Sequence, residues 1–381
     1  MAFNKKTKKF LKHNIGVITI ALFLVIFMIL SFSGNLSMST EFLLEKIAIS
    51  ILLAVSLGLV VGFLGELSLG QAGFMCIGAY LGGKVASLIA PSLGVGLPTL
   101  LISILVGGIT AALSGLLIGL PALRLKGDYL AIVTLAFGEI VKTIFLNTSA
   151  DSFGGATGLE TPRYSRQYLF MYAFIFVIIM LLVITNLIRS KHGRAITAIR
   201  DSEMASRATG INVTRYKLLV FALSAFFAGV AGVFYSFSNF QVQSTKFDYN
   251  YSIEILVMVV LGGMGNINGS IISAALITFL QVKLATVLTG DYAVLQNVLY
   301  ALILVLIVIY NNSPKLKNFR EKYNLKALIR KVIKPKNDPS IQKEDEARWD
   351  RVPTKINMDE LLSMDIKVQE SVVKPDKGGK D

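Results

Sequence analysis

Long apolar runs separated by short polar segments dominate this chain between residues 15 and 310. A helix needs about 20 consecutive apolar residues to cross the hydrocarbon core of a bilayer, and several of these runs approach or exceed that length. The pattern predicts an all-α fold, that of a polytopic helical membrane protein. The predicted crossings are 15–32, 42–64, 69–89, 97–120, 129–146, 168–188, 218–237, 251–261, 270–288 and 292–310.

The distribution of basic residues predicts the orientation of these crossings, because positive charge gathers in the short loops on the cytoplasmic side. Five lysines in residues 1–14 predict a cytoplasmic N-terminus and an uncleaved first span. Counting from there places 189–217 inside and 147–167 outside, the latter as an irregular surface loop. A basic run after residue 310 predicts a cytoplasmic C-terminus as well. That requires 251–261 to cross, which gives about ten transmembrane segments, or eight if segments re-enter.

Charge, cysteine and histidine content exclude several kinds of binding site in this chain. The net charge of +14 lies at the N-terminus, in short loops and after the last run, which is an orientation signal rather than a nucleic-acid footprint. Cys76 is the only cysteine, so an internal disulfide is excluded. Neither His13 nor His192 has metal ligands at a suitable spacing, and we predict no metal site. The segment Gly78–Lys84 matches the start of a P-loop, but Val85 replaces the required Ser or Thr, so no nucleotide cofactor is expected.

The segment Arg189–Lys217, called here the central polar segment, interrupts the apolar pattern with seven basic residues. Five of its apolar residues fall close to helical spacing and predict one short amphipathic helix that starts at Gly193 and stops at Gly210. These five residues are Ala195, Ile196, Ile199, Met204 and Ala208. Two interpretations remain open: a helix that docks into a groove of a partner protein, or a charged loop that lies against lipid headgroups.

Two glycine-rich clusters lie within the predicted membrane region. The first contains Gly65, Ser68, Gly70, Gln71 and Gly73, and the second contains Gly262, Gly263, Gly265 and Asn266. Glycines let helices approach closely or break, and a broken helix at membrane depth is tolerated only where protein or a cavity covers it. The paired interruptions therefore predict a substrate path. Tight helix packing without contact to a solute is the alternative.

Two further features concern charge. Glu139 and Lys142 lie one helical turn apart inside a predicted span, and we predict a structural ion pair because an isolated charge there is costly. A proton relay is the alternative, but it needs further acids in series, and the sequence does not supply them. Beyond the last apolar run, residues 311–381 mix charged residues with Pro and Gln, which predicts a largely disordered cytoplasmic tail.

Several blocks of this sequence carry a family resemblance. They are GELSLGQAGFMCIGAY (65–80), LPALRLKGDYLAIVTLAFGEI (120–140), FGGATGL (153–159), GRAITAIRDSEMASRATGINVTRYKLLVFALSAFFAGVAGVFYS (193–236) and SIEILVMVVLGGMGNINGS (252–270). In this order they resemble the permease subunits of ATP-binding-cassette importers for branched-chain amino acids, in particular the LivM type. The blocks cover most of residues 42–310. Cys76 and Gln71 depart from the glycine and histidine that are common at their positions in the family.

The resemblance implies that the central polar segment is a coupling helix, which sits in a cleft of an ATPase subunit. The coupling residues would be Gly193, Arg194, Ile196, Ile199, Arg200, Glu203, Ala205 and Gly210. It also implies a transport subunit without catalytic activity in the bacterial cytoplasmic membrane. The apolar pattern assigns the transmembrane domain of this subunit to residues 15–310. Its partners would be a second related permease, two ATPase subunits that hold ATP and magnesium, and an external solute-binding protein.

The expected function is translocation of leucine, isoleucine and valine, energised by separate ATPase subunits. Permeases for urea or short amides have similar blocks, and sugar or nucleoside permeases are more remote relatives. From a different class, an ion-coupled secondary transporter should contain a connected set of membrane acids, and a channel should transport without any ATPase. Uptake that requires ATP hydrolysis by a copurified partner would separate the importer from both.

Overall fold

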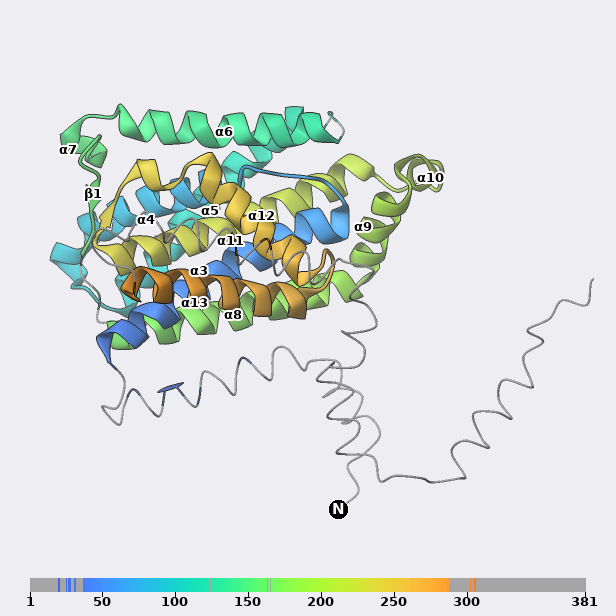
Figure 1. The fold of residues 1–381 in the computed structure, drawn as a ribbon. Coiled ribbons are helices and arrows are strands. Elements are labelled where there is room, and N and C mark those ends of the chain that lie inside the picture. The colour runs from blue at the N-terminus through green and yellow to red at the C-terminus, as the bar shows by residue number, and fades with distance from the viewer. Residues whose placement is uncertain are drawn as a thin grey trace, which may run out of the picture. The chain divides into compact units, whose positions relative to one another are not determined.

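The structure, a computed structural model, describes residues 37–287 except 124, 126, 163 and 165, together with seven isolated residues within 15–32 and 292–310 (Figure 1). The predicted N-terminal segment 1–14 and tail 311–381 lie outside the described residues. The elements are α3 (Met38–Gly58), η1 (Leu59–Leu64), α4 (Gln71–Leu93), α5 (Leu97–Ala122), α6 (Asp128–Leu146), α7 (Ala150–Phe153), β1 (Leu159–Glu160), α8 (Arg166–Arg189), α9 (Lys191–Asp201), α10 (Glu203–Ala208), α11 (Val213–Asn239), β2 (Gln241–Val242), η2 (Ser244–Lys246), α12 (Tyr249–Gly262) and α13 (Ile267–Val287).

Seven of the described helices are long and apolar enough to cross a membrane: α3 with η1, α4, α5, α6, α8, α11 and α13. The chain is therefore an all-α polytopic membrane protein with at least seven candidate spans. The predicted run 251–261 forms α12, whose 14 residues would extend roughly 21 Å, short of the ~30 Å of a hydrocarbon core. The runs 15–32 and 292–310 fall largely outside the described residues, so the count of ten stays a prediction.

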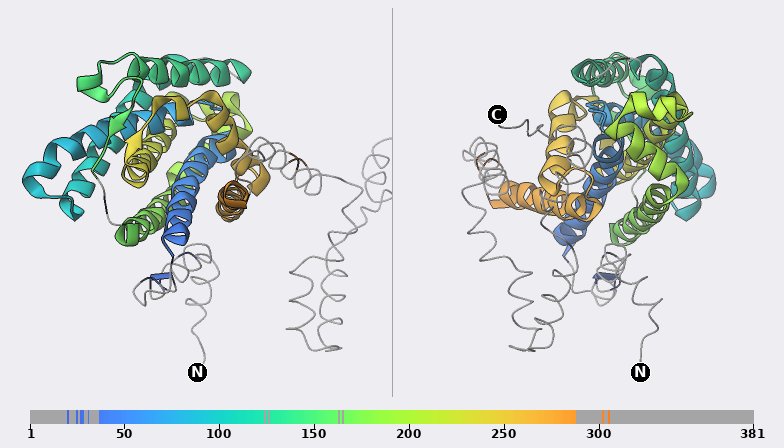
Figure 2. Two further views of the ribbon diagram at one scale, coloured as in Figure 1. Left: turned by 60° about the vertical axis from the view of Figure 1, so that its left-hand side comes forward. Right: turned by 90° about the vertical axis from the view of Figure 1, so that its right-hand side faces the viewer.

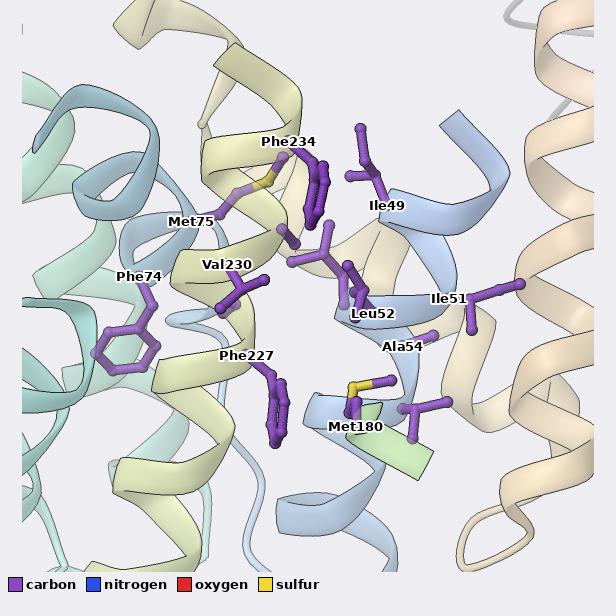
Figure 3. Close-up of a cluster of buried hydrophobic side chains, with 14 of the residues drawn as sticks. Ile49, Ile51, Leu52, Ala54, Phe74, Met75, Met180, Phe227, Val230 and Phe234 are labelled. Atoms are coloured by element: carbon purple, nitrogen blue, oxygen red, sulfur yellow. The ribbon is translucent and has the colours of Figure 1, made fainter. Parts of the chain in front are cut away.

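Helix α3 lies at the centre of the bundle, between α8 and α13 in both views of Figure 2. It is buried along most of its length, as expected for a span hydrophobic all round. Figure 3 shows side chains of α3, α4, α8 and α11 meeting in one core. The labelled residues include Ile49, Leu52, Phe74, Met75, Met180, Phe227, Val230 and Phe234, all nearly inaccessible to solvent. These four helices form the framework that positions the rest.

Small residues set the distance between α4, α5 and α11. A Cβ atom added to Gly78 of α4 would overlap the backbone of Gly229 of α11, and one added to Gly107 of α5 would lie 2.9 Å from the Gly78 carbonyl oxygen. Helices in a bilayer gain little from apolar burial alone and rely on such close backbone contact. The three helices therefore pack with their backbones in close contact.

The outer helices carry large apolar side chains away from the core. Helix α5 exposes Leu101, Leu105, Ile109, Leu113 and Leu117, all at least 44% accessible. An apolar surface of this extent is unsuited to water, whereas lipid chains or a neighbouring membrane subunit would cover it. The exposed faces thus agree with a membrane-embedded bundle.

The predicted irregular loop 147–167 has more structure than expected. It contains the short helix α7 and strand β1, which pairs in antiparallel register with β2, Leu159 opposite Val242. The Tyr80 hydroxyl of α4 donates to the Val242 carbonyl oxygen at 3.0 Å. Composition alone suggested a loop because the strand partner is distant in sequence. This pairing ties the loop to the end of the bundle opposite α9 and α10 (Figure 1).

Candidate functional site

The first glycine-rich cluster begins where the central helix is interrupted. Helix α3 continues into η1, a six-residue π-helix. The amide groups of Gly65 and Glu66 both donate to the Val60 carbonyl oxygen, and Gly65 has φ +79°. A left-handed backbone favours glycine because it carries no Cβ. Residues 66–70 are not helical, and α4 starts only at Gln71. π-Helical segments of this kind are frequent at functional sites.

The two glycine-rich clusters meet in space. A Cβ atom added to Gly62, within η1, would lie 2.8 Å from the Gly265 Cα atom, and the backbone nitrogen of Gly265 lies closer still. Gly265 belongs to the turn 263–266, which joins α12 to α13 and has positive φ at Gly263 and Gly265. Two interruptions that are far apart in sequence are thus in backbone contact, named here the glycine contact.

The central polar segment forms two helices, and the prediction of a single helix is wrong. Helix α9 ends at Asp201 and α10 begins at Glu203. Between them Ser202 is extended, with φ −159° and ψ 108°, and its hydroxyl accepts a hydrogen bond from the Ala205 amide. Serine is favoured at the N-cap position of a helix, because its side-chain oxygen accepts a hydrogen bond from an amide that has no partner within the helix. The break changes which side chains face the bundle.

Both ends of the segment have well-defined local causes. At its start the Ser190 hydroxyl accepts from the amides of His192 and Gly193, and a Cβ atom on Gly193 would come within 2.5 Å of the Ile188 Cα atom. At its end the Ile211 amide donates to the Ser206 carbonyl oxygen, and Gly210 has φ +83°. This is the Schellman arrangement that terminates helices. The predicted stop at Gly210 is confirmed.

The apolar residues of the segment point in different directions. Ile196 and Ile199 of α9, expected on a face that contacts a partner protein, are buried against the bundle instead. Met204 is 78% exposed, and Ala205 is also exposed, so the expected shared apolar face does not form. The bend at Ser202 changes the direction of the chain between α9 and α10 and leaves the Met204 side chain exposed. Arg194 is likewise exposed on α9.

Helix α9 contacts the interrupted helix directly. The Arg200 Nη1 atom donates to the Gly62 carbonyl oxygen at 3.1 Å, and its Nε atom donates to Asp201 at 3.1 Å. A Cβ atom on Gly65 would lie 2.6 Å from the Arg200 Cγ atom. The arginine therefore connects the central polar segment to the glycine contact, since Gly62 takes part in both.

A cluster of four charged side chains, the junction cluster, makes a second connection. It consists of Glu66, Glu203, Arg207 and Lys217. The Lys217 ammonium at the start of α11 pairs with Glu66, next to η1, and lies 3.3 Å from the Glu203 carboxylate of α10. Arg207 pairs with Glu203 from the solvent side. The Lys217 side chain is only 3% exposed, so these partners are what keeps its charge in place.

The charge state of Glu203 follows from these contacts. Partial burial alone would raise its pKa, but the neighbouring Lys217 and Arg207 side chains outweigh burial and hold the pKa of the Glu203 carboxyl below its ordinary value. Glu203 is therefore ionised at neutral pH, and its contribution to stability is lost only as the pH falls through that lowered value.

Other residues predicted for the path have structural roles. The Gln71 amide donates to the Ser56 and Ser224 hydroxyls at 2.7 and 3.5 Å, which links α4 to α3 and α11. A Cβ atom added to Gly73 would lie 2.8 Å from the Gly138 Cα atom of α6, which agrees with the packing alternative. Ser68 is buried, and its hydroxyl has no hydrogen-bond partner among the described residues.

Within the second cluster, turn chemistry explains the sequence. The Asn266 side chain accepts from the Gly269 amide at 3.2 Å and caps α13. Gly262 packs against Gly269 across the reversal of the chain. In the first cluster, a Cβ atom added to Gly70 would lie 2.9 Å from the Thr134 carbonyl oxygen of α6. The structure thus brings Gly62 and Gly265 together, with Gly65 against Arg200 beside them, and assigns packing roles to Gly70, Gly73 and Gly262 and a turn role to Gly263.

The sequence matches a known protein family over most of its length. A family model described as "Branched-chain amino acid transport system / permease component" matches residues 39–308. The chain belongs to this family. The matched region contains both glycine-rich clusters and the central polar segment.

Several relatives agree with this family. The high-affinity branched-chain amino acid transport system permease proteins LivM of Salmonella typhimurium and Escherichia coli are each 37% identical over 261 residues, 60% of both chains. A probable LivM of Methanocaldococcus jannaschii is 29% identical over 67% of this chain and 75% of its own length. The ribose import permease protein RbsC of Haemophilus influenzae is 26% identical over 72% of this chain and 86% of its own. No solved structure matches.

The match covers only part of the first two relatives. The chain spans 60% of the length of the Salmonella and Escherichia proteins.

The Lys142 ammonium pairs with one oxygen of the Glu139 carboxylate. The other oxygen of that carboxylate accepts a hydrogen bond from the Tyr249 amide at 2.9 Å. Glu139 thereby joins α6 to the start of α12.

Among the residues that the structure describes, no three His, Cys, Asp or Glu side chains gather to hold a metal ion.

Sequence reasoning missed the partners in the junction cluster. Within residues 65–80 the sequence pattern predicts a role for the glycines, Ser68 and Gln71 but none for Glu66, and Lys217 is one of the seven basic residues of the central polar segment. The available signal was their position: each is a charge placed where a predicted span meets the central polar segment or an interruption. Their pairing could not be read from the sequence, because 151 residues separate them.

Proposed function

We propose that this chain is the membrane-spanning subunit of an ATP-driven importer for branched-chain amino acids in the bacterial cytoplasmic membrane. Two ATPase subunits would hold ATP and magnesium, so this chain needs no cofactor of its own and catalyses no reaction. A second related permease would complete the membrane part, and an external binding protein would deliver the solute. Both termini and the central polar segment would face the cytoplasm.

One observation carries the proposal: the central polar segment is attached to the interrupted helix at two points. Arg200 hydrogen-bonds to Gly62, and Lys217 joins Glu203 to Glu66. A movement imposed on α9 and α10 from outside therefore reaches the glycine contact through the hydrogen bond of Arg200 and the ion pairs of Lys217. Such a connection is what an external motor requires to open and close a path.

The mechanism follows from this attachment. Closure of the ATPase subunits around ATP would displace α9 and α10, and Arg200 and Lys217 would pass that displacement to η1 and residues 65–70. No side chain lies between the backbones of Gly62 and Gly265. A small shift of η1 would therefore separate or join the two interruptions. The glycine contact would act as the inner barrier of the path, and substrates would pass when it opens.

Uptake into vesicles tests the function. The chain, copurified with its native partners and reconstituted with the binding protein, is expected to import labelled leucine only when ATP is supplied. Unlabelled isoleucine and valine should compete, and urea and ribose should not. If urea or ribose competes and isoleucine and valine do not, the competing compound would be assigned as the substrate instead. Uptake without any ATPase subunit would contradict the importer and favour a channel or a secondary transporter.

Exposed Met204 provides a sharper prediction about the docking surface. Replacing Met204 by Glu is expected to weaken capture of the ATPase subunit about tenfold or more, because a charge would enter an apolar contact at the centre of the interface. The melting temperature of the chain should not change, since the side chain touches little of the bundle. Pull-down with a tagged ATPase subunit measures the effect.

The matched control is Met38→Glu. Met38 is 77% exposed at the first turn of α3, at the other end of that helix from η1, and its replacement should leave capture unchanged. Equal capture by Met204→Glu and Met38→Glu would refute docking through α10 and would favour the alternative in which the segment lies on lipid headgroups.

A further inference from the structure

A cavity of about 530 Å³ lies far from the junction cluster. Residues of α3, α11, η2, α12 and α13 line it. One of them, Tyr235, follows Val213 by 22 residues on α11, which corresponds to about 33 Å along a helix. Because Val213 follows the central polar segment closely, the cavity lies at the opposite end of the bundle. The mechanism described above does not use it.

Thr278 of α13 is the first sign that this cavity holds a ligand. The residue is one of those that line the cavity and is only 4% exposed, and its buried hydroxyl has no hydrogen-bond partner among the described residues. Buried hydroxyls are nearly always paired, because leaving one unpaired is costly. A ligand with a polar group at this depth would satisfy the Thr278 hydroxyl.

The other walls specify the kind of ligand. Lys46 and Lys246 contribute positive charge, and Glu254, which accepts a hydrogen bond from Gln281, contributes negative charge. The Lys46 ammonium is oriented by the Asn239 side chain at 3.0 Å and by the Tyr235 ring, 4.4 Å from its centroid. Charges of both signs within one cavity suit a molecule that carries both signs itself.

Apolar side chains complete the lining. Phe247, which is buried, follows η2, and Val282 and Ala285 lie on α13, one turn beyond Thr278 and Gln281. Sites for small ligands combine such apolar walls with a few polar groups that set orientation. A carboxylate, an ammonium group and an aliphatic side chain would each find a matching wall here.

We infer that this cavity binds the zwitterion of a small aliphatic amino acid, with the carboxylate toward Lys46 and Lys246 and the ammonium group toward Glu254. The inference rests on the proposed function, because it makes the cavity an entry site ahead of the glycine contact. The Thr278 hydroxyl donates to the bound carboxylate or accepts from the bound ammonium group. The site belongs to the permease chain itself and does not need the binding protein.

Equilibrium binding of labelled L-leucine tests the site. The chain is purified with its partner subunits in lipid nanodiscs, without ATP and without the binding protein. Thr278→Val is expected to weaken leucine binding about fivefold, and Glu254→Gln about tenfold or more. Thr278→Ser should restore binding because it keeps the hydroxyl. Two variants on the same helix, outside the cavity lining, serve as controls: Thr286→Val and Lys283→Met should bind as the unaltered chain does.

Each outcome decides the inference. Unaltered leucine affinity in Thr278→Val and Glu254→Gln overturns it, as does the absence of any leucine binding by the unaltered chain. If ATP-driven leucine uptake persists in either case, the proposed function still stands. If labelled glycerophosphoethanolamine binds and leucine does not, the cavity holds a lipid headgroup instead, which also overturns the inference. Should Thr278→Val fail to assemble, the isosteric Glu254→Gln variant decides.

Discussion

Replacing Lys217 by Met is expected to lower the free energy of unfolding of the chain by about 3 kcal/mol and to abolish ATP-driven uptake. The side chain is 3% exposed, and its ammonium lies between the carboxylates of Glu66 and Glu203. Removing it leaves two negative charges close together in a partly buried place, where their repulsion is poorly screened. The same change detaches α10 from the interrupted helix, so ATPase movement would no longer reach the glycine contact.

Thermal melting of the purified chain and uptake by reconstituted vesicles measure the two effects separately. Lys191→Met is the matched control, since Lys191 is an exposed cation at the start of α9 and its removal should be nearly neutral. Adding Glu203→Gln to Lys217→Met should recover part of the lost stability, because one of the two carboxylates that repel each other becomes neutral. A melting temperature equal to that of Lys191→Met would disprove the structural role of the junction cluster.

Gly62→Ala is expected to cost about 2 kcal/mol and to reduce uptake strongly, because the new methyl group would overlap the Gly265 backbone, 2.8 Å from its Cα atom. Backbone on both sides leaves no flexible side chain to move aside. The turn 263–266 or the π-helical segment would have to shift, and the inner barrier would no longer close fully.

The control for this variant lies one turn earlier in the same stretch of helix. A Cβ atom on Gly58 would meet the Ser270 hydroxyl oxygen at 3.7 Å, an ordinary contact, so Gly58→Ala should be tolerated and even gain from the better helix propensity of alanine. Melting temperature and uptake of the two variants are compared. If Gly62→Ala behaves like Gly58→Ala, the glycine contact has no part in transport.

The residue pattern predicted the helices well and their internal details poorly. Apolar runs predicted α3, α4, α5, α6, α8, α11 and α13, because a helix that must cross hydrocarbon is recognisable by its length and composition. The stop at Gly210 was also predictable, since only a glycine adopts that φ cheaply. The break at Ser202 was not predictable, because the helical spacing of the apolar residues continues through it. The Ser202 side chain caps α10, and α9 ends just before it. For the same reason Met204, expected on one apolar face with Ile196 and Ile199, is exposed while those two residues are buried.

The candidate site was predictable in parts. Glycine-rich clusters around Gly65 and Gly265 were expected to belong together, and the structure places them in contact through Gly62. Gly70 and Gly73, expected in the same path, pack against α6 instead. A glycine in a sequence indicates that some atom comes close, but it does not say whether that atom belongs to a neighbouring helix or to a second interruption.

By itself, the sequence determined that this protein is an all-helical membrane protein with a basic segment between two spans, because the cost of placing charge or unpaired backbone in hydrocarbon leaves few alternatives. It also carried the motifs by which the family is recognised. Only the tertiary structure decided that Lys217 pairs with Glu66, that Arg200 binds the Gly62 carbonyl, and that Thr278 lines a cavity. The first two contacts join residues 151 and 138 positions apart, and local spacing holds no information about such distant partners.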